Sequence, residues 1–95
     1  MTKEDIQALF PIKAEVTQEI LDTSNVGSIH QCNGAKTLQS VLKLEEPWYV
    51  HWGDRQGYIA NKENYNLFIE VTTDEDISFM SITEPTTVTF KLAEI

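Results

Sequence analysis

Residues 48–60 constrain the fold most, because this stretch contains both tryptophans and two of the three tyrosines of the chain. Successive side chains of a strand point to opposite faces of its sheet. The alternation therefore places one set of side chains on each face: Trp48, Val50 and Trp52 on the first, Tyr49 and His51 on the second. Aromatic and β-branched residues favour such a half-buried surface. The sequence predicts a strand here.

The residues that follow predict a β-hairpin. Glycine tolerates the positive φ that tight reversals use, and either Gly53-Asp54 or Gln56-Gly57 fits the tip. The apolar run at 58–60 then pairs back onto the first strand. The sequence leaves the choice between the two tips open.

The two tryptophans have two interpretations. In the first they belong to the core, where truncation of a buried tryptophan costs roughly 3–5 kcal/mol. In the second they form an exposed strip that binds a partner, since Trp, Tyr and Arg are enriched at interface hot spots. We favour the core, because the other strands need a surface to pack on. The opposite face and the tip of the hairpin are then the predicted contact residues: Tyr49, His51, Asp54 and Arg55.

The length of 95 residues predicts one domain, residues 1–95, that folds without disulfides or metals. Apolar runs are far shorter than the ~20 residues of a membrane helix, and the N-terminus lacks the pattern of a signal peptide. The single cysteine, Cys32, suits a reducing compartment. We therefore expect a soluble, cytoplasmic protein.

The formal charge of −8 is unevenly distributed, with one lysine and seven acids in residues 63–95. This field opposes direct binding to nucleic acid or to anionic membranes, both of which need Lys and Arg to neutralise phosphates. A basic protein surface is the expected partner. The acidic run Asp74-Glu75-Asp76 joins the candidate contact residues.

Capping signals and periodicity predict the elements of the N-terminal half. Thr2 and Asp5 form a capping-box pattern for a short helix, and alternation over residues 10–17 predicts a strand. Thr17 caps a helical turn at 18–21, and residues 22–28 are rich in loop formers.

A second helix is predicted from Gly34 to about Lys43, with Asn33 as its N-cap. Its predicted apolar face consists of Leu38, Val41 and Leu42. Strands follow at 65–71, with Tyr65, Leu67, Ile69 and Val71 on one side, and at 86–92.

This order predicts an α+β domain. Its mainly antiparallel sheet has four to six strands, with one principal helix, at about 34–43, and one or two short helices. The first and last strands are candidates for pairing, but the sequence does not determine the strand order.

No constellation in the sequence specifies catalysis. The run from Gly27 to Thr37 has six residues between its glycines, whereas a phosphate-binding loop has four, so it fits an ordinary capped helix better. Cys32 with His30 or His51 lacks a group that would orient the base, and these three residues lack the paired spacing of a zinc site. Residues 74–76 lack the spaced oxygens and the glycine of a calcium loop. We expect no enzyme activity, cofactor or metal.

The segment from Trp48 to Ile59, with its Asp54-Arg55-Gln56-Gly57-Tyr58-Ile59 run, resembles the distal hairpin of Src-homology-3 domains. Residues 8–14, Ala-Leu-Phe-Pro-Ile-Lys-Ala, are similar to the opening Ala-Leu-Tyr-Asp-Tyr motif of that family. The resemblance implies a barrel that grips proline-rich peptides between Phe10, Trp48 and Tyr65. The chain departs from the family at Ile12, at Ala60 in place of the groove proline, and in its predicted helix.

Three functions follow from these patterns. The leading hypothesis is a small, acidic, non-catalytic interaction module, a regulator or inhibitor such as bacteria and phages encode, that acts on a basic partner surface. The first alternative is the Src-homology-3-like barrel. The second is a structural subunit of a homo-oligomer or viral assembly, which self-associates through strand edges and aromatic faces.

Overall fold

The computed structural model describes residues 2–25, 27–75 and 77–93. Five antiparallel strands form one sheet in the order β1-β5-β4-β3-β2. The strands are β1 (Ile12–Val16), β2 (Trp48–Trp52), β3 (Gln56–Asn61), β4 (Asn64–Thr73) and β5 (Thr86–Leu92). The helices are α1 (Lys3–Gln7), α2 (Gln18–Thr23) and α3 (Asn33–Leu42), with a 3₁₀ turn, η1, at Phe79–Ser81. The predicted α+β class, with one principal helix, is confirmed.

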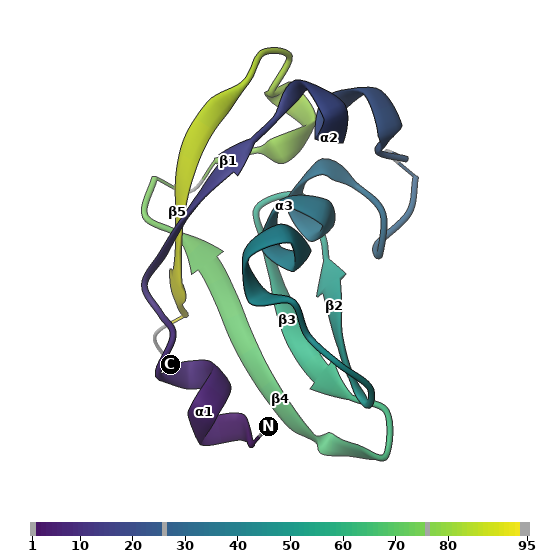
Figure 1. Ribbon diagram of the computed structural model, residues 1–95, viewed down its shortest axis with the longest axis vertical. Coiled ribbons are helices and arrows are strands. Elements are labelled where there is room, and N and C mark those ends of the chain that lie inside the picture. The colour runs from purple at the N-terminus through teal and green to yellow at the C-terminus, as the bar shows by residue number, and fades with distance from the viewer. Residues whose placement is uncertain (1, 26, 76, 94–95) are drawn as a thin grey trace.

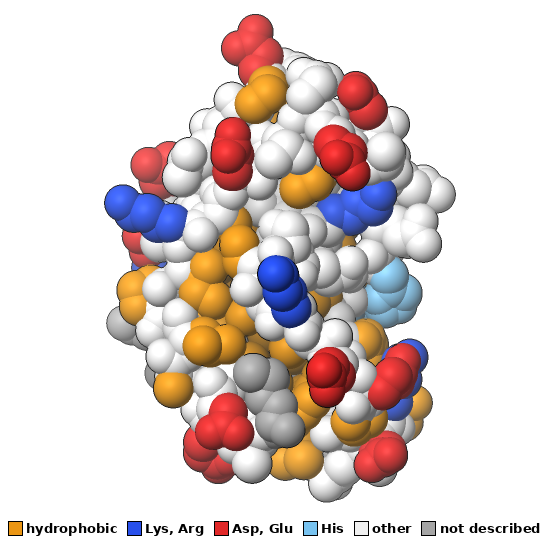
Figure 2. Space-filling model, viewed as in Figure 1, with side chains coloured by type: hydrophobic (Ala, Val, Ile, Leu, Met, Phe, Trp, Pro, Cys, Tyr) orange, Lys and Arg blue, Asp and Glu red, His pale blue; other side chains and the backbone are white. Residues whose placement is uncertain are grey.

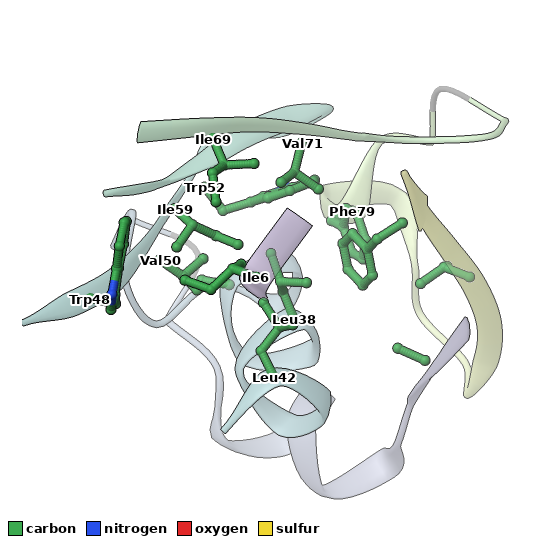
Figure 3. Close-up of a cluster of buried hydrophobic side chains, with 14 of the residues drawn as sticks. Ile6, Leu38, Leu42, Trp48, Val50, Trp52, Ile59, Ile69, Val71 and Phe79 are labelled. Carbon is green, nitrogen blue, oxygen red and sulfur yellow. The ribbon is translucent and has the colours of Figure 1, made fainter. Parts of the chain in front are cut away.

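The sheet curls around α3, which contacts both edge strands, β1 and β2 (Figure 1). The hydrophobic core fills the space between the concave face of the sheet and this helix. Figure 3 shows Leu38 and Leu42 of α3 directed toward Val50, Ile59 and other strand residues. The helix thus covers the concave face where the two edge strands approach it.

Hydrogen bonds confirm the predicted helix starts in the N-terminal half. The Asp5 amide donates to Oγ1 of Thr2 at 3.1 Å, and the Thr2 amide donates to the Asp5 carboxylate at 3.0 Å, which completes the capping box. Thr17 Oγ1 accepts from the Ile20 amide at 3.2 Å. The first and last strands, which the sequence left as candidates for pairing, do pair: Ala14 lies opposite Val88 in the antiparallel register.

Two details of α3 differ from the prediction. The N-cap is Cys32, whose side chain makes no capping hydrogen bond, and Asn33 is the first helical residue. The side-chain amide of Asn33 instead donates to the Phe79 carbonyl at 3.2 Å. This hydrogen bond ties the start of α3 to η1. Val41 is 37% exposed, whereas Leu38 and Leu42 are buried, so the inward face turns toward Ala35 and away from Val41.

The hairpin tip lies at residues 53–55, because Trp52 pairs with Gly57 across the two strands. Gly57 therefore belongs to β3. No glycine of the described residues has a positive φ, so the expectation that Gly53 or Gly57 serves the turn in this way is wrong. A Cβ there would lie 2.6 Å from Cε3 of Trp52 and 2.3 Å from the His51 carbonyl oxygen. Glycine is needed at this position because the backbone of His51 and Trp52 and the indole ring of Trp52 leave no room for a Cβ.

Both tryptophans belong to the core. Trp48 is 7% exposed and Trp52 is 1% exposed. The Trp52 ring packs edge-on against Phe79 and Phe90, with ring centroids 5.5 and 5.3 Å apart. The Trp48, Val50 and Trp52 face of the hairpin thus supplies the core, as predicted.

The free edge of β2 is covered by the loop that precedes α3. The Trp52 amide donates to the Ile29 carbonyl at 2.8 Å, and Nδ1 of His30 lies 2.8 Å from the Val50 carbonyl oxygen. A covered edge cannot pair with another strand along these residues. The loop also fixes the position of the His30 ring beside the hairpin.

Among the described residues, no helix is long and apolar enough to cross a membrane.

Candidate functional site

Exposed acidic side chains lie at both ends of the molecule, and one group of them lies at the upper end in Figure 2. The antiparallel pairing of β1 with β5 brings the end of β1 beside the turn that precedes β5, and α2 follows β1 directly. This acidic end consists of Glu15, Glu19, Asp22 and Glu84, all exposed. Figure 2 shows acidic side chains at the upper end, over α2 and the turn before β5, with basic side chains below them. Residues far apart in the sequence therefore form one acidic surface.

Basic groups lie at the margins of the acidic end. The Lys36 ammonium donates to the Thr23 carbonyl at 3.1 Å and to the Thr23 hydroxyl at 2.7 Å. It thereby provides a hydrogen-bond donor for the carbonyl group at the end of α2. Lys91 lies 4.0 Å from the Asp74 carboxylate. The four carboxylates themselves form no ion pair with any described residue.

The predicted contact residues Asp74 and Glu75 are exposed and lie beside β5, where the Asp74 amide donates to the Thr89 carbonyl at 3.1 Å. They line a small hollow together with Thr87 of β5, and Thr87 lies opposite Glu15 of β1 in the sheet. The third member of the predicted run, Asp76, lies outside the described residues.

Asp54 and Arg55 lie at the hairpin tip, close to the end of β4. The Asp54 carboxylate accepts hydrogen bonds from the Ser78 hydroxyl at 2.6 Å and the Met80 amide at 3.0 Å. These two bonds, that to Ser78 first, lower the pKa of Asp54 below its usual value. Asp54 therefore anchors the η1 segment, and its contact with a partner stays a prediction.

Tyr49 and His51 lie on the convex face of the sheet within a row of ring side chains. The row contains His30, Tyr49, His51, Tyr58 and Phe68. The His51 and Tyr58 rings stack at 4.4 Å, and the Tyr58 hydroxyl lies 3.0 Å from Nδ1 of His51. Burial first, and then the positive charge of His30, lower the pKa of His51. Asp54, whose carboxylate bonds to Ser78 and Met80, does not belong to this row, and Arg55 is exposed at the hairpin tip.

Beside this row, a groove with a volume of about 590 Å³ opens where α3 ends and β2 begins. Its walls hold three basic or imidazole groups, His30, Lys43 and Lys62, together with Gln39, Leu44, Trp48, Tyr49, Val50 and Tyr65. Lys62 lies 3.2 Å from Glu46 and 5.8 Å from the centre of the Tyr49 ring. Tyr49, one of the predicted contact residues, is among the residues that line this groove.

Tyr65 is the groove residue whose position the sequence misplaced. The alternation of β4 put it on the same side as Ile69 and Val71, which are buried, yet Tyr65 is 73% exposed. The β3–β4 register shifts between Ala60 and Asn61, and the strands beyond this point extend past the core. Of the residues that the family resemblance assigned to peptide binding, Trp48 and Tyr65 share the groove, while Phe10 packs against the core.

The residues considered for chemistry are engaged elsewhere. The Cys32 thiol lies 3.7 Å from the Trp52 carbonyl oxygen, and Nδ1 of His30 and of His51 contact Val50 and Tyr58. Within the described ranges, no group of three or more His, Cys, Asp or Glu side chains is placed to hold a metal ion. The absence of enzyme activity stays a prediction.

Comparisons with protein-family models, with curated proteins and with solved structures find no match to this chain.

Proposed function

We propose that this protein is a non-catalytic interaction module whose acidic end docks on a basic surface of a partner protein. The observation that carries the proposal is the convergence on one exposed end of two stretches far apart in the chain, which supply Glu15, Glu19 and Asp22 on one side and Glu84 on the other. Carboxylates arranged in this way steer a basic partner toward the surface and favour its docking there. Asp74 and Glu75 extend the contact along β5.

The proposed role is that of a small regulator or inhibitor, which covers a basic surface that its partner uses for another ligand. The proposed location is the cytoplasm, where a single free cysteine such as Cys32 stays reduced. The protein itself would not bind nucleic acid, because a net charge of −8 repels phosphates.

Affinity capture from the cells that produce the protein tests this proposal. The test variant carries Glu15→Gln, Glu19→Gln, Asp22→Asn and Glu84→Gln. The control variant carries four neutralisations outside this end, Glu4→Gln, Glu45→Gln, Glu63→Gln and Glu70→Gln, and so has the same net charge. Mass spectrometry then compares the proteins recovered by each variant and by the wild type at rising salt.

We expect the wild type and the control to recover the same basic protein, and the test variant to lose it. Recovery should fall as salt rises from about 0.05 to 0.5 M, because screening weakens contacts between exposed charges. Equal recovery by both variants, or recovery indifferent to salt, would contradict the proposal.

The two alternative functions stay predictions. Self-assembly predicts an oligomer in sedimentation experiments at high protein concentration, and a monomer throughout would remove it. A Src-homology-3-like activity predicts binding of proline-rich peptides next to Trp48 and Tyr65, which share the groove at the start of β2.

A further inference from the structure

The two edge strands of the sheet differ in how their outer edges are covered. The loop before α3 bonds to β2, at the Val50 carbonyl and the Trp52 amide. β1 lies at the other margin of the sheet, with β5 on one side and no strand of the described residues on the other (Figure 1). An uncovered edge of this kind is a template for pairing with another chain.

The backbone amide and carbonyl groups of Lys13 and Glu15 point away from β5. Along a strand, the backbone groups of successive residues point to alternate sides. The Thr89 carbonyl accepts a hydrogen bond on the β4 side, so the groups of Val88 face β1 and pair with Ala14 opposite. Among the described residues, nothing bonds to the outward groups of Lys13 and Glu15. Buried backbone groups are nearly always paired, so these groups are open to solvent.

The side chains of Lys13 and Glu15 carry opposite charges on the exposed face of β1. They lie opposite threonines of β5, which carry no charge. Lys91, the charged residue of β5, lies 4.0 Å from the Asp74 carboxylate. Neither Lys13 nor Glu15 forms an ion pair with a described residue. Both charges are therefore available to a second chain.

The order Lys13-Ala14-Glu15 is complementary to itself in antiparallel pairing. Around a twofold axis at Ala14, Lys13 of each copy would lie opposite Glu15 of the other. Such a pair exchanges both of its backbone N–H···O bonds, and opposite charges directly across from each other stabilise a sheet. A register centred on Lys13 or on Glu15 would instead place like charges opposite each other, which destabilises pairing.

We propose that two copies of this chain pair through the outer edges of β1, antiparallel and centred on Ala14, so that their sheets become continuous. The net charge of −8 opposes this association, but salt at physiological strength screens charges more than about 8 Å apart. The antiparallel arrangement also places the acidic ends of the two copies at opposite ends of the pair. A single short strand forms a weak contact, so the dimer is expected at high protein concentration.

This pairing goes beyond the docking function of the acidic end, and it gives the self-association alternative a specific surface. Glu15 belongs to both surfaces, whereas Lys13 belongs only to the edge of β1. A variant at Lys13 therefore separates the two proposals. Lys13→Glu should abolish pairing without weakening capture of a basic partner by the acidic end.

Analytical ultracentrifugation of the full chain tests the proposal, from micromolar to millimolar concentration at about 0.15 M salt. The test variants are Lys13→Glu, Glu15→Lys and the double exchange that carries both substitutions. The controls are Lys43→Glu and Glu63→Lys, which make the same changes of net charge outside β1. Circular dichroism verifies that each variant is folded.

We expect the wild type to approach twice the mass of one chain at high concentration. Lys13→Glu and Glu15→Lys should each weaken pairing about tenfold, because like charges replace both pairs of opposite charge. The double exchange should pair like the wild type, because it reverses both signs and keeps opposite charges facing each other. An equimolar mixture of the two single variants should form mixed pairs for the same reason. Both controls should pair nearly like the wild type.

Amide hydrogen exchange, followed by NMR, locates the contact. The amides of Lys13 and Glu15 should exchange rapidly in dilute protein and slow down as the concentration rises, because pairing provides their hydrogen-bond acceptors. The Ala14 amide already faces β5, so its exchange serves as the internal reference.

Three results would overturn the proposal. A monomer at every concentration would show that the edge of β1 does not pair. If the double exchange loses pairing as the single variants do, the charges do not select a second copy. A dimer in which the Lys13 and Glu15 amides still exchange rapidly would place the contact elsewhere on the chain.

Discussion

Gly34→Ala is predicted to destabilise the fold through the Trp52 ring. Gly34 lies in the first turn of α3, where a Cβ would be 2.3 Å from both Cδ1 and Nε1 of Trp52. Ordinary contacts begin at about 3.4 Å, so the helix and the ring must separate by about 1 Å. The ring cannot move freely, because it is 1% exposed and packs against Phe79 and Phe90.

The expected magnitude is a loss of about 2 kcal/mol in the free energy of unfolding. Over-packing of a well-packed core costs about 1–3 kcal/mol. The intrinsic preference of a helix for alanine over glycine returns at most about 1 kcal/mol, and less in the first turn. For a domain of this size, such a loss lowers the melting temperature by about 8–16 °C.

Thermal and urea unfolding, followed by circular dichroism, measure this change. The matched control is Gly27→Ala, whose Cβ would lie 3.7 Å from the nearest neighbouring atom and should leave stability nearly unchanged. A double-mutant cycle with Trp52→Phe isolates the contact, because the smaller ring should relieve most of the Gly34→Ala penalty. If Gly34→Ala is as stable as the wild type, or if the penalty persists with Trp52→Phe, the packing argument is wrong.

Three further perturbations have defined outcomes. Lys43→Gly should raise stability by about 1 kcal/mol in thermal melts, because glycine relieves the left-handed backbone strain; an unchanged melting temperature would contradict this strain. Asp54→Ala should cost about 1–2 kcal/mol, because it leaves the Ser78 hydroxyl unpaired. Because the pKa of Asp54 is lowered in the folded protein, its stabilisation is fully present above the pKa of the unfolded chain and is lost as pH falls through the lower folded pKa. Asp54→Ala should therefore weaken the dependence of stability on acid pH. The lowered pKa of His51 means that the unfolded chain binds its proton first, so stability should fall as pH drops below about 6.5. His30→Gln should raise the pKa of His51 in an NMR titration, and an unchanged pKa would exclude the charge of His30 as a cause.

Local rules predicted most of the elements. The capping box at Thr2, the cap at Thr17 and the alternation along the hairpin depend on residues within a few positions of one another, and all three are confirmed. The burial of Trp48 and Trp52 followed from the need of a small sheet for a core. These features could be predicted because the physics that sets them is local.

The sequence does not locate the acidic end, because the number of charges along a chain does not show which charged residues meet in space. The counts placed the negative charge in the last third, whereas Glu15, Glu19 and Asp22 come from the first third. They lie at the same end as Glu84 because β1 pairs with β5. The sequence made this pairing a candidate but did not determine it. The residues that form a charged surface can be identified only when the strand order is known.

The groove was missed for a similar reason. Alternation along β4 places Tyr65 on the side of the buried Ile69 and Val71, but it does not reveal the β3–β4 register shift between Ala60 and Asn61. The sequence predicts Lys43 as the end of the principal helix, but its left-handed backbone has no signal in the sequence. Likewise, the role of Gly57 depends on the neighbouring Trp52 ring, which only the three-dimensional packing reveals.

Chemical-shift mapping by NMR tests the central claim most directly. The partner recovered by affinity capture would be titrated into the isotopically labelled protein, and the amide signals that shift would be assigned. The docking account predicts that the largest shifts occur at Glu15, Glu19, Asp22 and Glu84, and that they vanish with the four-residue neutralised variant. Shifts confined to the convex face around Tyr49 and His51, with no change at the acidic end, would contradict it.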